Sequence, residues 1–221
     1  MLSKSPSYTL IAVCTLALGI SANTIVFSTS DAVLRPLSFP NQDRLVMLFE
    51  RNPEIGITRS LVSTGDVIEC RAQAQTLQEV IAIQNRDYAL TAEGMPERHT
   101  SYEVSAAFFD ALGVQPLLGR GFQRGEDEEG HAQVVVLRHG FWETRFGADP
   151  QIVGKQILLN DKPFEIIGVM PRHFEFPYGV GDMWTPLVIE PRMKQDHRSH
   201  QLRAVGLLRQ GYTVAQASAE L

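Results

Sequence analysis

The sequence predicts an α+β protein in which a long apolar helix precedes a domain of short strands and short helices. The first observation is a stretch without any charged residue between Lys4 and Asp31. The second is that the following sequence breaks into short apolar runs separated by turn residues, typical of a mixed domain of ordinary size. The third is a formal charge of −5 with a pI near 5.7. That balance argues against a nucleic-acid partner, because phosphate binding needs a basic face.

The stretch from Tyr8 to Leu34 carries large apolar side chains at positions that cover every face of a helix. Such a helix needs lipid or a large core around it. A helix from Ser5 to Ser30 would be about 39 Å long, which exceeds the roughly 30 Å hydrocarbon core of a bilayer. We therefore predict that residues 1–35 form a transmembrane and stalk helix, which crosses the membrane once in this chain.

Two alternatives to a membrane anchor stay open for this stretch. A cleaved secretory signal would use Lys4 as its basic start, Leu10–Leu18 as its apolar region and Gly19–Ala22 as its cleavage site. The chain would then be a secreted or lipid-surface-associated binding module. A helix buried in a protein core is the other alternative. The apolar pattern resumes after Ala22 with Ile25, Val26 and Phe27, which favours the anchor.

The first elements of the domain follow a break at Arg35-Pro36, where proline ends the helix. Leu45–Glu50 predicts a buried strand. Ser63–Ile83 predicts helical structure, either as one helix or as two, because Thr76 and Glu79 have the spacing of a capping box.

A hairpin and a short helix come next. Tyr88–Thr91 and Arg98–Val104 predict two paired strands. Ser105 is then expected to cap a helix over Ala106–Leu112 that ends at Gly113.

The remaining segments continue the same alternation. The predicted strands are Val134–Leu137, Gln156–Leu159, Phe164–Met170, Trp184–Ile189 and Leu202–Leu208. Asn160-Asp161 is expected to turn the second of these into the third. Gly140–Phe146 predicts a short helix, and Thr213 with Gln216 opens another that the chain end interrupts at Leu221. We therefore expect this chain to be a fragment, truncated at its C-terminus.

A long pattern of motifs resembles a known family. Its residues are Val104–Val114, Pro116–Arg120, Glu126-Asp127, Val134–Leu137, Phe141-Trp142, Arg145–Gly147, Asp149-Pro150, Ile152–Lys155, Leu159-Asn160, Ile166–Pro171, and Asp182 with Trp184–Leu187. Their order and spacing resemble the extracytoplasmic core domain of MacB/FtsX-type ABC transporter permeases. The N-terminal helix, with Gly19, Asn23 and Leu34–Leu37, is similar to that family's first membrane helix. Arg138 and Asp161 depart from the family pattern, and we expect both to be surface-turn changes.

The resemblance implies a MacB-like periplasmic core domain over residues 36–221. Residues 36–86 and 200–221 would form a porter-like βαβ part, and residues 87–199 a β-rich part. It also implies a non-catalytic permease subunit in the bacterial inner membrane, with its main domain periplasmic or extracellular. A separate ABC-type ATPase would drive export or mechanotransmission, and a second permease subunit would complete a homodimer.

Residues with catalytic chemistry do not form a recognisable set. The sequence contains no phosphate-binding loop of the Gly-Lys-Ser/Thr kind, so the chain is not expected to be the ATPase. Ser105 lacks the context of a nucleophile elbow, which leaves a hydrolase as a minor hypothesis. We predict no catalytic residue, no cofactor-binding residue and no cofactor, and we expect a non-enzymatic subunit.

Candidate metal ligands and aromatic clusters favour structural roles. His197 and His200 have helical i, i+3 spacing, but we find no carboxylate or cysteine that completes a site, and Arg198 lies between them. Glu126–Glu129 lacks the alternating spacing of a calcium loop. We therefore predict no metal site. Cys70 is expected to be a small buried apolar residue. The aromatic residues could line a ligand groove but are expected to belong to the core: Phe108, Phe109, Phe141, Trp142 and Trp184.

Overall fold

The computed structural model describes residues 40–52, 56–91, 96–174 and 181–221. The predicted transmembrane helix at 1–35 lies outside these residues. The chain divides into two units, Met1–Leu37 and Ser38–Leu221, and every described residue belongs to the second. Within the described ranges, no helix is long and apolar enough to cross a membrane.

Short elements make up the domain. Its helices are η2 (Gln42–Arg44), α2 (Thr64–Gln73), α3 (Phe108–Leu112), α4 (His139–Phe146), η4 (Pro191–Met193) and α5 (Val214–Glu220). Its strands are β1 (Leu45–Leu48), β2 (Glu50–Asn52), β3 (Ile57–Ser60), β4 (Leu77–Thr91), β5 (Glu97–Val104), β6 (Leu118–Gly119), β7 (Val134–Leu137), β8 (Gln156–Leu159), β9 (Lys162–Val169), β10 (Met183–Pro186) and β11 (Arg203–Leu208). This mixture confirms the predicted α+β composition.

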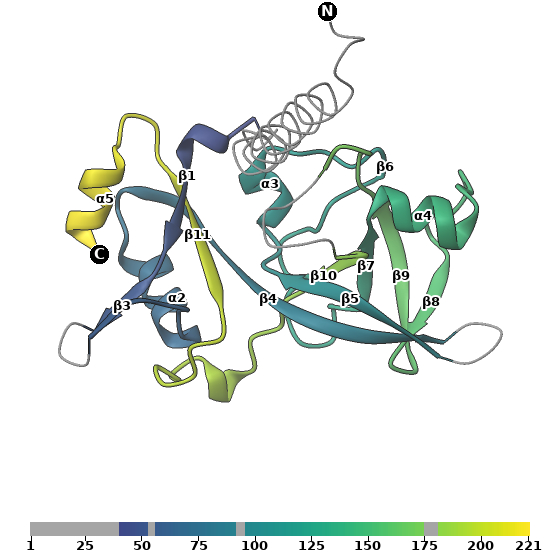
Figure 1. Cartoon of the computed structure of the whole chain (residues 1–221), viewed down its shortest axis with the longest axis horizontal. Coiled ribbons are helices and arrows are strands. Elements are labelled where there is room, and N and C mark those ends of the chain that lie inside the picture. The colour runs from purple at the N-terminus through teal and green to yellow at the C-terminus, as the bar shows by residue number, and fades with distance from the viewer. Residues whose placement is uncertain (1–39, 53–55, 92–95, 175–180) are drawn as a thin grey trace, which may run out of the picture. The chain divides into compact units, whose positions relative to one another are not determined.

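Nine of the described strands form one mixed sheet in the order β1-β11-β4-β5-β10-β7-β9-β6, with β8 paired to β4 and β9. Most neighbouring pairs are antiparallel, while β10 runs parallel to β5 and β7 runs parallel to β9. Figure 1 shows that β1, β11, α2 and α5 lie at one end of the domain, and β7, β8, β9 and α4 at the other. β2 and β3 form a separate two-stranded sheet.

Strand β4 joins the two ends of the domain (Figure 1). Its 15 residues span about 50 Å at roughly 3.3 Å per residue. Leu77–Ile83 pairs with β11, and Ile83–Leu90 pairs with β5 on the other edge. The same strand therefore supplies backbone hydrogen bonds to both halves of the sheet.

Each half has its own apolar cluster. The cluster near α2 contains Val62, Val67, Leu77, Val80, Ala82, Leu187, Leu202, Ala204, Leu208 and Ala217. The cluster near α4 contains Tyr88, Leu90, Val135, Leu137, Phe141, Trp142, Ile152, Leu159, Phe164, Ile166, Val169 and Met183. All five aromatic residues expected in the core are buried, each at most 8% exposed. The division into residues 36–86 with 200–221 and 87–199 stays a prediction.

The expectation of helical structure throughout Ser63–Ile83 is wrong beyond Gln73. Helix α2 begins after Ser63, whose hydroxyl accepts a hydrogen bond from the Asp66 amide, and it ends at Gln73. The chain then enters β4 at Leu77. The residues from Val80 to Ile83 are all buried, so both faces of the strand are apolar. A short apolar run of this kind does not distinguish a helix from a buried strand by periodicity.

The expectation that Ser105 caps a helix is also wrong. Helix α3 follows Ala107, which makes no side-chain cap, although its end at Gly113 has the predicted left-handed conformation, with φ of 73°. The buried Ser105 hydroxyl instead accepts hydrogen bonds from the Ala82 amide at 2.8 Å and the Arg71 guanidinium at 2.6 Å. Arg71 also donates to the Val80 carbonyl at 2.8 Å. These bonds join α2 to β4 and to the end of β5.

Other predicted elements are confirmed within one or two residues, namely β5, β7, α4, β8, β11 and α5. The predicted strand at Trp184–Ile189 is shorter, because β10 ends at Pro186. The Asn160-Asp161 turn is confirmed between β8 and β9. Both of its residues have positive φ, 49° and 61°, as in a type I′ turn.

We expect Ser105→Ala to lower the free energy of unfolding by about 1–3 kcal/mol, because it leaves the buried Ala82 amide and the Arg71 guanidinium without their acceptor. Urea unfolding of the purified chain measures this loss. Ser218→Ala, on the exposed surface of α5, is the matched control and should unfold like the wild type. Equal midpoints for all three proteins would contradict the assigned role of Ser105.

We expect Asp161→Gly to stabilise the chain by up to about 1 kcal/mol, because glycine adopts positive φ without a steric cost. The thermal midpoint should rise by about 2–4 °C. Asp161→Ala keeps the steric cost and should give no gain. A lower midpoint for the glycine variant would show that the contact of Asp161 with Thr91 outweighs the turn geometry.

Candidate functional site

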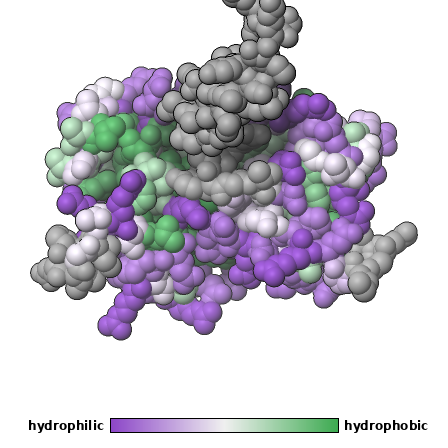
Figure 2. All heavy atoms as spheres, viewed as in Figure 1, coloured by the Kyte–Doolittle hydropathy of each residue, from purple (hydrophilic) through white to green (hydrophobic). Residues whose placement is uncertain are grey.

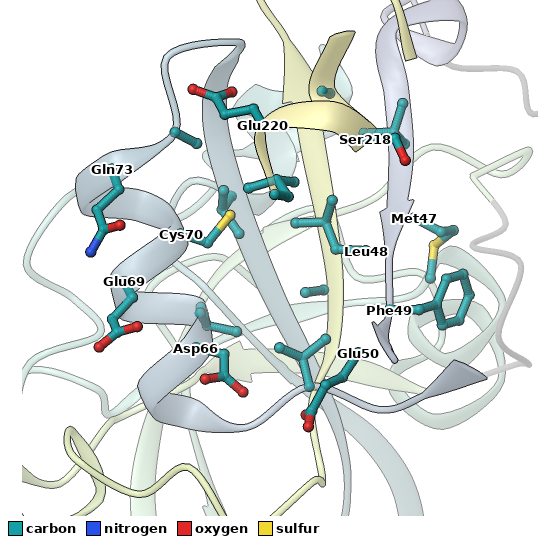
Figure 3. Close-up of a pocket in the computed structure, with 18 of the residues that line it drawn as sticks. Met47, Leu48, Phe49, Glu50, Asp66, Glu69, Cys70, Gln73, Ser218 and Glu220 are labelled. Carbon is teal, nitrogen blue, oxygen red and sulfur yellow. The ribbon is translucent and has the colours of Figure 1, made fainter. Parts of the chain in front are cut away.

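A groove lies between α2, strand β1 and α5. It is an open cavity of about 960 Å³. Figure 3 shows side chains from the three elements converging on this space. In Figure 2, apolar side chains gather on the surface at this end of the domain. The groove therefore lies in an apolar part of the surface, beside the edge strand β1.

The floor of the groove is apolar. Val67 and Val80 are fully buried, while Val46 and Leu48 on β1 are half-buried. Strand β1 pairs only with β11 among the described strands, so its other edge has no described strand neighbour. Edge strands can accept a further strand from a partner.

The rim of the groove is acidic. Glu50, Asp66, Glu69 and Glu220 line it, and Arg51 is the single cation among the described lining residues. In Figure 3, Asp66 and Glu50 lie at one end and Glu220 lies at the other. An apolar floor with this rim is complementary to an apolar segment flanked by basic groups.

Helix α5 forms one wall and is held in place by Glu220. The Glu220 carboxylate accepts hydrogen bonds from the Thr76 hydroxyl, from the Gln75 amide at 2.5 Å and from the Thr76 amide at 2.9 Å. These bonds, first of all the one from the Thr76 side chain, lower the pKa of Glu220. The start of the helix carries the predicted capping box between Thr213 and Gln216. Ala217 packs inward, while Val214 is 60% exposed beside the groove.

Cys70 lines the same groove and is a free thiol. Its side chain is half-buried, so it is less enclosed than the sequence analysis expects. Burial raises the pKa of the thiol, and the nearby Glu220 carboxylate raises it further. A thiol with a raised pKa is a poor nucleophile at neutral pH.

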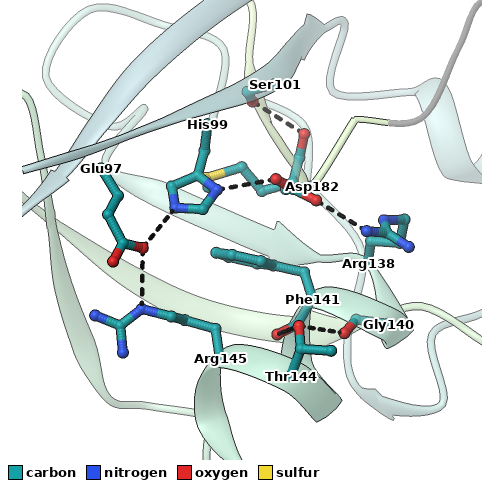
Figure 4. Close-up of polar contacts among 10 residues, drawn as sticks. Glu97, His99, Ser101, Arg138, Gly140, Phe141, Thr144, Arg145 and Asp182 are labelled. Atoms are coloured by element: carbon teal, nitrogen blue, oxygen red, sulfur yellow. Dashed lines mark hydrogen bonds and ion pairs between the residues drawn. The ribbon is translucent and has the colours of Figure 1, made fainter.

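A second polar cluster lies between β5, β10 and α4 (Figure 4). Asp182 is its centre: Oδ2 lies 2.9 Å from Nδ1 of His99, and Oδ1 accepts a hydrogen bond from Arg138 at 2.9 Å. The His99 ring packs on Phe141, with the ring centroids 4.7 Å apart. Arg138 is half-buried and precedes α4, so it braces two strands and is more than the surface-turn change that the sequence analysis expects.

The His99–Asp182 pair resembles a catalytic dyad, but no nucleophile among the described residues is hydrogen-bonded to His99. The other ring nitrogen, Nε2, lies 3.5 Å from Glu97, which in turn lies 3.7 Å from Arg145. The neighbouring Ser101 hydroxyl donates to the Met183 carbonyl (Figure 4). In this arrangement the cluster serves as a brace between strands and helix.

The candidate ligand residues of the sequence analysis lie in three places. Glu126 forms an ion pair with Arg120 at 2.7 Å, and Asp127 accepts a hydrogen bond from the Ala106 amide. His197 and His200 each have a carboxylate beside them, and the expectation of no metal site stays a prediction. Nδ1 of His197 lies 2.7 Å from Asp66, and Nδ1 of His200 lies 2.7 Å from Glu50.

Asp66 and His197 affect each other's ionisation. The hydrogen bond with Asp66 raises the pKa of His197. Partial burial acts to raise the pKa of Asp66, but hydrogen bonds from Ser63 and His197 outweigh it and lower that pKa overall. The two residues are 131 positions apart, which is why no sequence spacing could reveal the pair.

Both the sequence and the fold of this chain are similar to those of known proteins. The model of the MacB-like periplasmic core domain matches residues 9–221. The chain belongs to that family. The predicted resemblance to MacB-type permeases is thereby confirmed.

The curated relatives are named as export ATP-binding/permease proteins. A macrolide export ATP-binding/permease protein MacB of Neisseria meningitidis is 30% identical over 137 residues, covering 55% of this chain and 21% of the relative. MacB of Wolinella succinogenes is 28% identical over 163 residues, covering 70% of this chain and 24% of the relative. A probable syringafactin export protein of Pseudomonas syringae, SyfD, is 29% identical over 117 residues, covering 48% of this chain and 18% of the relative. The chain thus spans about a fifth of the length of these relatives.

Solved structures share the fold at low identity. A domain of a putative permease from Porphyromonas gingivalis gives a TM-score of 0.63 at 16% identity, covering 83% of each chain. The periplasmic region of MacB from Actinobacillus actinomycetemcomitans gives 0.58 at 16% identity, covering 80% of this chain and 79% of the other. The mixed α/β domain of this MacB-like chain therefore has the architecture of periplasmic permease domains.

We expect the attachment of α5 to weaken in acid, because the pKa of Glu220 is lowered in the folded chain. Its contribution to stability is present above the ordinary value of 4.5 and is lost as the pH falls through the folded value. Thermal unfolding of wild type and Glu220→Gln between pH 7 and pH 3 measures it: the two midpoints should converge in acid. Glu129→Gln, in an exposed loop, is the control and should follow the wild type. A constant gap between wild type and Glu220→Gln would contradict the assignment.

Proposed function

We propose that the chain is the extracytoplasmic part of a non-catalytic ABC transporter permease subunit, anchored in the bacterial inner membrane by its apolar N-terminal segment. The observation that carries this proposal is the family match over residues 9–221, which begins inside the apolar stretch and continues through the folded domain. The fold shared with periplasmic permease domains supports it. The charge-free length of the N-terminal segment supports the anchor.

A separate ATPase supplies the energy in this proposal. Relatives carry ATP-binding and permease parts under one name, which supports an ABC-type ATPase as the source of energy. The domain would then transmit motion in export or mechanotransmission. Strand β4, which is hydrogen-bonded to both halves of the sheet, gives the domain the stiffness that such a role requires. A second copy of the permease subunit completes the working unit.

The groove between α2, β1 and α5 is the surface at which the domain contacts another envelope protein. Its apolar floor offers area to bury, and its acidic rim selects a segment with basic flanks. Phe49, Val214 and Leu221, all lining the groove, are at least 36% exposed. Exposed apolar residues gathered on one face are typical of an interaction surface.

Membrane attachment is tested by alkaline carbonate extraction of cells that express the full-length protein together with its ATPase. We expect the protein to stay in the membrane pellet with Met1 intact, and the ATPase to co-purify with it from detergent. A soluble product whose sequence starts near Asn23 would contradict the membrane anchor and support the secreted binding module.

The groove contact is tested with Val214→Glu in the full-length protein. An unpaired carboxylate buried in an apolar contact costs on the order of 1–3 kcal/mol, so cross-linking to the envelope partner in cells should fall about tenfold. The helix itself should tolerate the change, because an acidic residue is favourable at a helix N-terminus. Val153→Glu, at an exposed apolar position outside the groove, is the matched control. Equal cross-linking in all three proteins would reject the groove as the contact surface.

A further inference from the structure

Three side chains with metal-ligating atoms converge beside the groove. Asp66 and Glu69 lie one turn apart on α2, and His197 lies in the segment that precedes β11. One ligand atom of each lies within 4.8 Å of the others. Nδ1 of His197 is 2.7 Å from Oδ1 of Asp66, and Nε2 is 3.8 Å from Oε1 of Glu69. One small cation could therefore reach all three after modest side-chain rotation.

The Asp66 carboxylate is held in place by the cap of α2. The Ser63 hydroxyl donates to Oδ2 of Asp66 at 2.7 Å, while the Asp66 amide donates to the Ser63 oxygen at 3.1 Å. Ser63 is itself completely buried. One carboxylate oxygen is thus fixed from behind, and Oδ1 is left to face His197. Metal sites use such outer hydrogen bonds to orient their ligands.

The position of the imidazole is set by Gly65. A Cβ atom at this position would lie 2.6–2.8 Å from three ring atoms of His197, closer than real Cβ contacts permit. The Gly65 amide also donates to the Asp196 carbonyl at 2.9 Å. Asp196 in turn accepts backbone hydrogen bonds from Arg198 and Ser199. The histidine is therefore held against α2 by backbone contacts as well as by its ring.

A second imidazole–carboxylate pair lies next to the first. His200 and Glu50 are 2.7 Å apart, and the charge of His200 acts on Asp66. Three carboxylates and two imidazoles thus share this end of the groove rim. With both histidines neutral the group carries a charge of about −3, which attracts cations.

We propose that Asp66, Glu69 and His197 bind a divalent transition-metal cation, for which Zn²⁺ is the best match. One imidazole with two carboxylates is a borderline ligand set: it suits Zn²⁺ better than the all-oxygen shell that Ca²⁺ prefers. The cation would replace the hydrogen bond between Nδ1 of His197 and Asp66. It would clip the segment before β11 to α2 and fix that end of the groove. This site is independent of the proposed transport function.

The ion pairs alone are the competing explanation, and one substitution separates the two. His197→Gln keeps a side-chain hydrogen-bond donor for Asp66 but removes the imidazole ligand. Isothermal titration of the purified full chain with ZnCl₂ in detergent is the measurement. We expect one ion per wild-type chain and a rise in thermal midpoint on its addition. His197→Gln should weaken this binding by about 10- to 100-fold and abolish the rise in midpoint.

Two further variants complete the test. Gly65→Ala leaves every ligand in the chain but displaces the imidazole, so it should also weaken Zn²⁺ binding. His173→Ala removes an exposed histidine elsewhere and should bind like the wild type. The proposal is overturned if wild type and His197→Gln bind Zn²⁺ equally, because the ion then sits elsewhere. It is also overturned if the wild type shows no saturable binding, because the three residues then form ion pairs only.

Discussion

The continuity of β4 is the constraint on which the rest of the domain depends. Its first half carries side chains of the cluster near α2, and its second half carries Tyr88 and Leu90 of the cluster near α4. Ile83 lies at the junction, paired with Arg203 on one edge and Val104 on the other. A strand that is hydrogen-bonded on both sides resists bending and stretching. The transmission of motion that we propose for this domain would need this property.

Side-chain hydrogen bonds hold the two helices of the groove, α2 and α5, in position against β4. Ser105 and Arg71 fix the last turn of α2 to β4, and Glu220 fixes α5 to the turn between α2 and β4. Both ties use backbone amides or carbonyls of β4 or of the residues just before it. The tie through Ser105 has buried partners, which makes it costly to break. The shape of the groove therefore depends on how α2 and α5 are fixed to β4. The same contacts set the positions of the acidic side chains on its rim.

Much of the fold could be predicted from local patterns. The Asn160-Asp161 turn, the glycine at the end of α3 and the capping box of α5 all follow from interactions within a few residues. The helix-to-strand change after Gln73 could not be predicted, because an apolar run buried on both faces has no period that separates strand from helix. The role of Ser105 escaped for a related reason: its partners, Ala82 and Arg71, are distant in sequence.

The sequence by itself determined the family, the acidic character, the apolar N-terminal stretch and most element boundaries, since these depend on composition and short-range order. Only the tertiary structure decided which charged groups meet. His197 and Asp66 are 131 positions apart, and His99 and Asp182 are 83 apart. Such pairs form because the pairing of β4 with its neighbours brings segments that are distant in sequence close together in space. Local sequence patterns do not predict these contacts. The groove and the proposed cation site at its end therefore depend on the tertiary structure.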